Sequence, residues 1–320
     1  MITVLAPDGV GEVRRGDDLA DHLLGVLPAS ELADGDVVCV TSKVVSKAEG
    51  RLVVGDRLAA VAAETRRLVA RRGPLRIVVN RLGLTMAAAG VDASNVEAGA
   101  VLLLPEDPDA SARALRATLA RRTGRNVAVV ITDTAGRAWR EGQTDVAIGA
   151  AGLVVLDDHA GRVDPYGNTL AVTAPAVADE LAGAAELAAG KLAGRPFVLV
   201  RGRSDLVLPP GEDGPGAAAL VRPPGGDLFG LGAREAVLAA LGGRPGDREA
   251  FGAPVAAGDL REVLASLSGG VVTEEDGALV VAADPADPRV VWAAEVAAYA
   301  HGWEAVDRTV SGVRLRPATP

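Results

Sequence analysis

The sequence is poor in aromatic side chains and in cysteine. Phe, Trp and Tyr together make up 2% of the 320 residues, and Cys39 is the single cysteine. One cysteine excludes an intramolecular disulfide and a cysteine-rich metal cluster. Cys39 lies in the apolar run 37–40, which predicts a buried strand position. Because hydrophobic residues still make up 49% of the chain, we expect a core built from Ala, Val and Leu.

Long apolar segments and an excess of positive charge are also missing. No segment approaches the roughly 18–20 apolar residues of a membrane span. The start of the chain, residues 1–4, is not a basic region ahead of a long apolar stretch, so we expect no secretory signal and a cytoplasmic protein. The formal net charge of -9 argues against a nucleic-acid partner, because phosphate binding requires a basic face.

The two common glycine-rich phosphate-binding motifs are absent as well. Asp133 and Gly136 follow an apolar strand as in the DxxG turn of P-loop GTPases, but that turn requires an earlier GxxxxGK[ST] loop. Lys191 follows a glycine, yet Leu192 stands where Ser or Thr is needed. A complete GxGxxG sequence is also missing. A small P-loop GTPase is therefore excluded.

Helix-like and strand-like segments alternate over the first 240 residues. The periodicity predicts helices over 17–27, 56–72, 111–123 and 175–191, and strands over 36–41, 75–79, 126–132 and 197–200. A Gly- and Pro-rich stretch over 242–247 reads as a linker. After it we expect helices over 259–267 and 288–300 and strands near 271, over 279–283 and over 308–315. The sequence thus predicts an α/β or α+β body over 1–242 and a small α+β appendage over 243–320.

Two short segments combine an aspartate with a nearby glycine. Asp92 lies in 89–95 and Asp133 in 131–137, and both segments allow a phosphate or metal to approach the backbone closely. Mg²⁺ and Mn²⁺ prefer hard oxygen ligands of this kind. The alternative is structural, with Asp92 in an Asx turn or helix cap and Asp133 in a turn that ends its strand.

Two further groups of polar residues have two interpretations each. Ser42 and Lys47 follow a strand and fit phosphate binding, although a solvated loop lysine is the simpler alternative. Arg137, Arg140 and a glutamate surround Trp139, either as a salt-linked surface or as a clamp for an anionic substrate. The three histidines lie far apart and are interpreted as structural or surface residues.

Taken together, six blocks of sequence resemble the coenzyme F420-0:L-glutamate ligase family. The resemblance extends over about residues 9–232, and the order of the blocks makes it specific. The blocks are 16–19, 34–51, 89–96, 132–143, 179–182 and 201–202.

The resemblance implies a GTP-dependent, metal-dependent, GDP-forming amide ligase of the acid–amino-acid class (EC 6.3.2). Its substrates are coenzyme F420-0, L-glutamate and GTP, and it adds successive γ-linked glutamates through an acyl phosphate. The implied fold is a two-lobed, mixed-sheet α+β fold particular to the family, and the implied assembly is a homodimer. The implied catalytic residues are Asp92, Asp133 and Lys47.

The resemblance also assigns ligands residue by residue. A divalent ion, Mg²⁺ or Mn²⁺, is held by Asp92, Asp133 and Thr134, and K⁺ is a candidate further ion. The family often has an acidic residue where this chain has Lys191, so a second metal site that used this carboxylate would lack it here. The implied GTP contacts are Val10, Gly11, Glu12, Val13, Ser42, Lys47, Asn95, Ala189, Gly190, Lys191, Leu192, Ala193, Gly194, Arg195 and Pro196.

Two other functions remain open at this point. The chain could be a catalytically silent GTP-binding or scaffold homologue, which would bind nucleotide without turnover. It could also be a flavin-linked reductase of the dehydro precursor, because some relatives carry a flavin-binding nitroreductase-like domain after the ligase part. Residues 243–320 are too few for that domain, so we expect no flavin.

Overall fold

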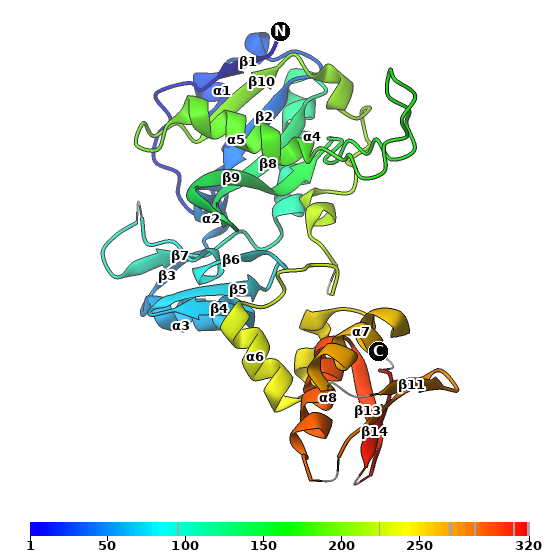
Figure 1. The fold of residues 1–320 in the computed structure, drawn as a ribbon. Coiled ribbons are helices and arrows are strands. Elements are labelled where there is room, and N and C mark those ends of the chain that lie inside the picture. Colours follow the sequence, from blue (N-terminus) through cyan, green and yellow to red (C-terminus); the bar gives the residue numbers. More distant parts are fainter. Residues whose placement is uncertain (95, 224, 269–270, 285, 310, 319–320) are drawn as a thin grey trace. The chain divides into compact units, whose positions relative to one another are not determined.

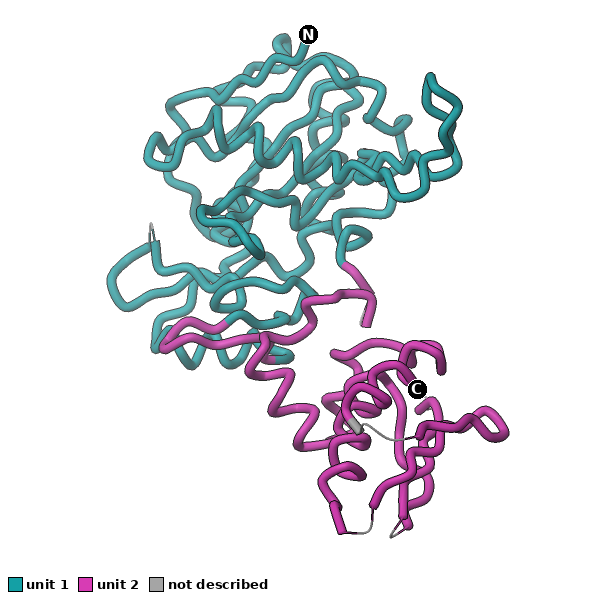
Figure 2. Tube along the Cα trace, viewed as in Figure 1, with its two compact units in different colours: residues 1–67, 77–221 teal, residues 68–76, 222–320 magenta. Residues whose placement is uncertain are grey.

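The computed structural model describes all residues except 95, 224, 269–270, 285, 310 and 319–320 (Figure 1). Its contacts divide the chain into two compact units. Unit 1 contains residues 1–67 and 77–221, and unit 2 contains residues 68–76 and 222–320 (Figure 2). The domain boundary expected after residue 242 lies inside unit 2 and stays a prediction, as does the two-lobed arrangement.

A five-stranded mixed sheet forms the centre of unit 1. Its strands, in the order β1-β10-β2-β8-β9, are β1 (Thr3–Leu5), β10 (Phe197–Arg201), β2 (Val37–Thr41), β8 (Ala128–Arg137) and β9 (Arg140–Ala151). Only β2 and β8 run parallel, with Val37 opposite Ala128 and Thr41 opposite Thr132, whereas the other pairs are antiparallel. This confirms the α+β class with a mixed sheet.

Helices cover both faces of this sheet because alternate strand residues point to opposite sides. Val38 and Val40 pack in one core with α1 (Leu19–Val26) and α4 (Pro108–Thr123). Val37 and Cys39 belong to a second core with α5 (Val177–Ala189). The apolar run over 37–40 is therefore buried on both faces, as expected for the central strands of a covered sheet.

Helix α2 (Ser42–Glu49) begins at the residue after β2. It ends at Gly50, whose φ of 73° is the left-handed conformation in which glycine commonly terminates helices. Lys43 and Lys47 lie four residues apart, and therefore on the same side of α2. The fold thus places two ammonium groups beside the carboxyl ends of the parallel strands β2 and β8.

Two smaller sheets correct one helix prediction. One sheet pairs β3 (Leu52–Val54) with β7 (Ala100–Leu102), and the other has the order β4 (Thr65–Arg72), β5 (Leu75–Asn80) and β6 (Thr85–Ala87). The helix predicted over 56–72 is wrong in its second half, because α3 (Arg57–Glu64) stops and the chain continues as β4. Most of these residues favour a helix, but intrinsic propensity is a weak determinant that pairing in the sheet overrides.

The structural alternative for Asp133, a turn that ends its strand, is also wrong. Strand β8 continues through Asp133 to Arg137, and the chain reverses only at residues 138–139 before β9. Short 3₁₀ helices complete the secondary structure at Ala29–Glu31, Ala88–Gly90, Ser204–Leu206, Ala217–Leu220 and Pro245–Phe251.

Unit 2 contains a four-stranded antiparallel sheet in the order β11-β12-β14-β13, with three helices. The strands are β11 (Val272–Glu275), β12 (Ala278–Ala282), β14 (Gly312–Pro317) and β13 (Trp303–Thr309), and the helices are α6 (Ala233–Gly242), α7 (Ala257–Ser268) and α8 (Arg289–Ala300). Its core is formed around Leu260, Leu264 and Trp303. The single strand predicted over 308–315 is the hairpin of β13 and β14. The linker predicted over 242–247 spans the end of α6 and the start of a 3₁₀ helix.

Among the described residues, no helix has the length and apolar character that crossing a membrane requires.

Candidate active site

A cavity of about 490 Å³ opens in unit 1 where β2 and β8 end. Its walls come from the loop 10–13, from α2, from the end of α5 and from the segment 189–196. The residues predicted from the sequence that line it are Val10, Gly11, Glu12, Val13, Lys47, Asp133, Thr134, Ala189, Gly190, Lys191, Leu192, Gly194, Arg195 and Pro196. Of the other predicted site residues, Ser42, Asp92 and Ala193 are not in its lining, and Asn95 lies outside the described residues.

The parallel pairing of β2 and β8 brings the first polar residues together. Thr41 is opposite Thr132, so the residues that follow, Ser42 and Asp133, are neighbours at the same edge of the sheet. The Ser42 hydroxyl donates a hydrogen bond of 2.9 Å to Oδ1 of Asp133. Ser42 is buried, so this residue acts on the cavity through the carboxylate of Asp133.

The carboxyl of Asp133 is a weaker acid than that of an ordinary aspartate. Burial, together with smaller effects of the negative charges of Asp145 and Asp92, raises the pKa of its carboxyl to about 6. The hydrogen bonds from Ser42 and from the Thr134 backbone N–H oppose this rise. Asp133 is thus a carboxylate that lacks compensating positive charge, as is common at binding and catalytic sites.

The sequence reasoning missed Asp145, which lies opposite Thr134 on β9. It is buried, and its carboxylate accepts hydrogen bonds from the hydroxyls of Thr132 at 3.0 Å and Thr134 at 2.8 Å. The alternation of Thr132 and Thr134 along one strand face could have suggested a polar partner on β9. Finding that partner required the hairpin register, which the predicted turn at Asp133 had hidden.

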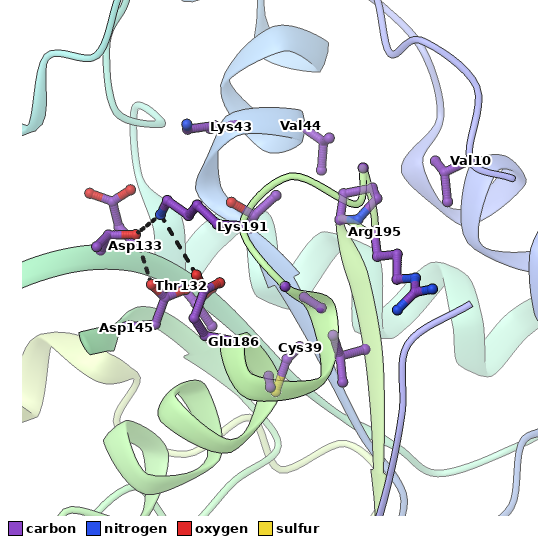
Figure 3. A pocket seen from close by; sticks show the side chains of 18 of the residues that line it. Val10, Cys39, Lys43, Val44, Thr132, Asp133, Asp145, Glu186, Lys191 and Arg195 are labelled. Carbon is purple, nitrogen blue, oxygen red and sulfur yellow. Dashed lines mark hydrogen bonds and ion pairs between the residues drawn. The ribbon is translucent and has the colours of Figure 1, made fainter. Parts of the chain in front are cut away.

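Lys191 extends from the segment 189–196 into the acidic end of the cavity. Its ammonium donates a hydrogen bond of 2.8 Å to Oγ1 of Thr134 and lies 3.7 Å from Oε1 of Glu186. Figure 3 shows the Lys191 side chain directed toward Asp133, Asp145 and Glu186. Glu186 is a second lining residue that the sequence reasoning missed, since α5 gave no signal that its end faces the sheet edge.

Asp92 forms an ion pair with Lys43, which lines the cavity. Nζ of Lys43 lies 2.7 Å from Oδ2 of Asp92, and it donates a hydrogen bond to Oγ of Ser94 at 2.7 Å. Oδ1 of Asp92 accepts from the Ser94 backbone N–H at 2.7 Å, which is the Asx-turn arrangement. Burial acts to raise the pKa of Asp92, but the hydrogen bonds from Lys43 and Ser94 outweigh it and lower the pKa.

Lys47 lies one helical turn after Lys43 and lines the cavity. Its ammonium is 2.6 Å from Oε1 of Glu12, in the loop 10–13. The Glu12 side chain is 67% exposed, so this pair is held weakly and an anion entering the cavity can compete for Lys47.

The predicted metal ligands are two carboxylates and one hydroxyl. Within the described part of the chain, no three His, Cys, Asp or Glu side chains form a group that could hold a metal ion. Asp92 is nevertheless close enough for its charge to act on Asp133. The assignment of Asp92, Asp133 and Thr134 as metal ligands stays a prediction.

Comparison with known proteins gives a family and several relatives. The family model described as F420-0:Gamma-glutamyl ligase matches residues 9–202. The chain is 42% identical to the coenzyme F420:L-glutamate ligase of Methanopyrus kandleri over 242 residues, which is 68% of this chain and 93% of that protein. It is 37% identical to the enzyme of the same name from Methanothermobacter thermautotrophicus over 224 residues, or 63% of this chain and 89% of that protein. The Natronomonas pharaonis relative is 41% identical over 223 residues, or 62% and 85%.

The matched region contains the whole of the site. Every residue that lines the cavity falls between Val10 and Val198, within the matched residues 9–202. The central strands β2 and β8, which bring Ser42 and Asp133 together, also lie in it. The chain belongs to the F420-0:gamma-glutamyl ligase family.

Proposed function

We propose that this chain is a GTP-dependent ligase that adds γ-linked L-glutamate residues to coenzyme F420-0 in coenzyme F420 biosynthesis. The observation that carries the proposal is the coincidence of the family match with one cavity, whose walls hold Asp133, Lys47 and Lys191. Its volume of about 490 Å³ lies within the range of small-molecule and cofactor sites. A soluble, cytoplasmic homodimer is part of the same proposal.

The reaction joins a carboxylate to an amine and therefore needs an activated acyl group. The terminal carboxylate of the acceptor attacks the γ-phosphorus of GTP, which forms an acyl phosphate and releases GDP. The amine of glutamate then attacks the acyl carbon, loses a proton, and expels inorganic phosphate to leave the amide. Both steps place negative charge on phosphoryl oxygens, so a site for this reaction needs fixed positive charge.

The lysines around the cavity fit the phosphates of GTP. Lys47 lines the wall, and Lys43 lies one turn before it on α2. In the structure these ammonium groups are held by the carboxylates of Glu12 and Asp92. A nucleotide phosphate carries more negative charge than either carboxylate, and we expect it to displace Glu12 from Lys47.

The predicted metal ligands also fit the group that the family implies. Asp92, Asp133 and Thr134 present carboxylate and hydroxyl oxygens, the donors that Mg²⁺ and Mn²⁺ prefer. The raised pKa of Asp133 indicates uncompensated negative charge at this place, which a cation would relieve. When bound, a divalent ion there supplies charge neutralisation for the phosphoryl oxygens.

The other polar residues orient these oxygens. Ser42 holds Oδ1 of Asp133 through its hydroxyl, which limits rotation of the carboxylate. Asp145 accepts a hydrogen bond from the Thr134 hydroxyl, which turns the lone pairs of Oγ1 toward the Lys191 ammonium that a cation would have to displace. Lys47 stabilises the developing charge on the transferred phosphoryl group.

The proposal is tested by incubating the purified chain with F420-0, L-glutamate, GTP and Mg²⁺ or Mn²⁺, followed by mass spectrometry. We expect mass increases of one or more glutamyl units that disappear when GTP is omitted or when EDTA is added. Replacement of GTP by ATP tests the choice of nucleotide. GTP binding without any glutamylated product would contradict the proposal and favour a silent nucleotide-binding homologue.

A further inference from the structure

The tip of the β8–β9 hairpin, residues 137–140, carries an unusual group of side chains. Arg137 and Arg140 form the last pair of the ladder, so two guanidinium groups start from directly opposite positions. Both residues are exposed. Like charges at opposite positions of two paired strands destabilise the pairing, so the tip carries this charge at a cost to its own stability.

Neither arginine is neutralised by an acid within the described part of the chain. Arg137 donates a hydrogen bond of 3.3 Å to the backbone carbonyl of Glu141 and not to its carboxylate. Other arginines of unit 1 do form ion pairs, such as Arg122 with Asp21 and Asp18. The salt-linked surface considered from the sequence is therefore not formed, and two positive charges face solvent in a chain of net charge -9.

Trp139 lies between the two arginines in a strained backbone conformation. Its φ is 59°, in the left-handed region that disfavours residues with a large side chain. Its side chain is 84% exposed, so burial of the ring does not compensate for the backbone strain. Strained residues of this kind cluster at ligand-binding and catalytic sites.

The tip continues the strand that forms the cavity wall. Asp133 and Thr134 line the cavity from β8, and Arg137 is the last residue of the same strand. At about 3.3 Å per residue, three residues separate Thr134 from Arg137 by about 10 Å. A molecule with one end in the cavity can therefore reach the tip along β8, and both places belong to unit 1.

We infer that the hairpin tip is the docking site for the body of the acceptor, because its side chains suit an anionic molecule with a planar ring system. The inference rests on the proposed function, in which the acceptor's terminal carboxylate must enter the cavity. Guanidinium groups bind carboxylate and phosphate oxygens in paired hydrogen bonds, and an exposed indole offers a face on which a flat ring stacks. Arg137, Trp139 and Arg140 are thus substrate-positioning residues that determine which acceptor is used.

The test is a fluorescence titration of the full chain with F420-0, run beside steady-state kinetics. We expect Arg137→Gln and Arg140→Gln each to weaken F420-0 binding severalfold and the double variant about tenfold or more. The KM for F420-0 should rise by a similar factor, while kcat and the KM values for GTP and glutamate stay unchanged. The losses should shrink at high salt, where the contribution of the charges is screened.

Two further variants separate docking from a general effect. Arg121→Gln removes one exposed arginine from α4, at the other end of β8, and should leave F420-0 binding unchanged. Trp139→Gly relieves the backbone strain but removes the ring, so we expect weaker F420-0 binding.

Each outcome decides the inference. Equal F420-0 binding by the unchanged protein and the double variant, with ligase activity intact, overturns the inference and leaves the proposed function in place. An equal loss of binding in Arg121→Gln also overturns it, because the effect would then belong to net charge. Failure of the unchanged protein both to bind and to glutamylate F420-0 overturns the inference and the proposed function together.

Discussion

The ammonium of Lys191 donates a hydrogen bond of 2.8 Å to the hydroxyl of Thr134, which in turn donates one of 2.8 Å to Asp145. A positive charge of the chain itself therefore lies against an oxygen that is predicted to bind a metal. The Lys191 side chain is 57% exposed, so it can leave this position. A divalent ion bound at the predicted ligands would compete with Lys191 for the same acidic end of the cavity.

This competition predicts the effect of removing the charge. We expect Lys191→Gln to bind Mn²⁺ about tenfold more tightly than the unchanged protein, because a positive charge next to Asp145 and Glu186 is lost. Mn²⁺ binding is measured by electron paramagnetic resonance without nucleotide. Lys191→Arg keeps the charge and is the matched control. Equal Mn²⁺ affinity in the Gln variant and the unchanged protein would show that Lys191 does not compete with the metal.

Asp133→Asn should raise the stability of the protein and lower its ligase activity. The fold raises the pKa of the Asp133 carboxyl from 3.8, its value in the unfolded chain, to about 6. The folded protein therefore binds the carboxyl proton more tightly, and this stabilisation is complete below pH 3.8 and is lost as the pH rises through 6. Above pH 7 the neutral amide avoids this cost, and we expect a gain of about 1–2 kcal/mol in the free energy of unfolding.

The same variant should lose at least about a hundredfold in ligase turnover, since a predicted metal ligand becomes neutral. Denaturant unfolding in EDTA and the mass-spectrometric assay measure the two effects. Asp109→Asn is a control in the same unit, because Asp109 accepts backbone N–H groups of Ala150 and Ala217 and is not in the cavity lining. Undiminished turnover in Asp133→Asn would remove Asp133 from the metal site.

Sequence reasoning identified most elements of the central sheet because their signals are local. The apolar run of β2 and the Gly-terminated helix α4 are visible in periodicity and end residues. The second half of the helix predicted over 56–72 failed because β4 forms by pairing with β5, which no local pattern records. The part of β8 beyond Thr132 was missed for the same reason, since Asp133 to Arg137 are held by pairing with β9.

The same difference between local and long-range signals separates the site residues that were found from the sequence from those that were missed. Residues that line the cavity from continuous segments, such as the loop 10–13 and the segment 189–196, were found from the sequence blocks. Asp145 and Glu186 were not, because each enters the cavity through the register of a strand or the rotation of a helix. The partners of the predicted lysines, Glu12 for Lys47 and Asp92 for Lys43, also depend on contacts between distant segments.

Arg116 is expected to be the charged side chain on which α4 depends most. It is buried, and its guanidinium lies 2.8 Å from Oδ1 of Asp213 and donates to the carbonyls of Val127 and Glu212 at 3.0 Å. Arg116→Met leaves these groups without their donor, and we expect a loss of about 3–5 kcal/mol in the free energy of unfolding. Urea unfolding measures it.

The exposed Arg121 on the same helix provides the comparison for Arg116. Arg121→Met should change stability by about 0.5 kcal/mol or less, because its side chain is exposed and donates a hydrogen bond to Thr118 of the same helix. Similar unfolding midpoints for the Met variants at 116 and 121 would contradict a special role of the buried guanidinium.

Because the Cys39 thiol is buried, we expect the protein to lose stability at alkaline pH. Burial, with a smaller effect of the Asp145 charge, raises the pKa of the Cys39 thiol from 9.0 to about 12. The fold therefore binds the thiol proton more tightly than the unfolded chain, and this stabilisation is complete below pH 9 and lost between pH 9 and 12. Above pH 9 the stability of the unchanged protein relative to Cys39→Ala should fall by about 1.4 kcal/mol per pH unit.

Chemical denaturation at pH 8, 9.5 and 10.5 measures this difference, and a thiol reagent should label Cys39 at pH 8 only after unfolding. A difference between the two proteins that does not change with pH, or rapid labelling of the native chain, would contradict a buried neutral thiol.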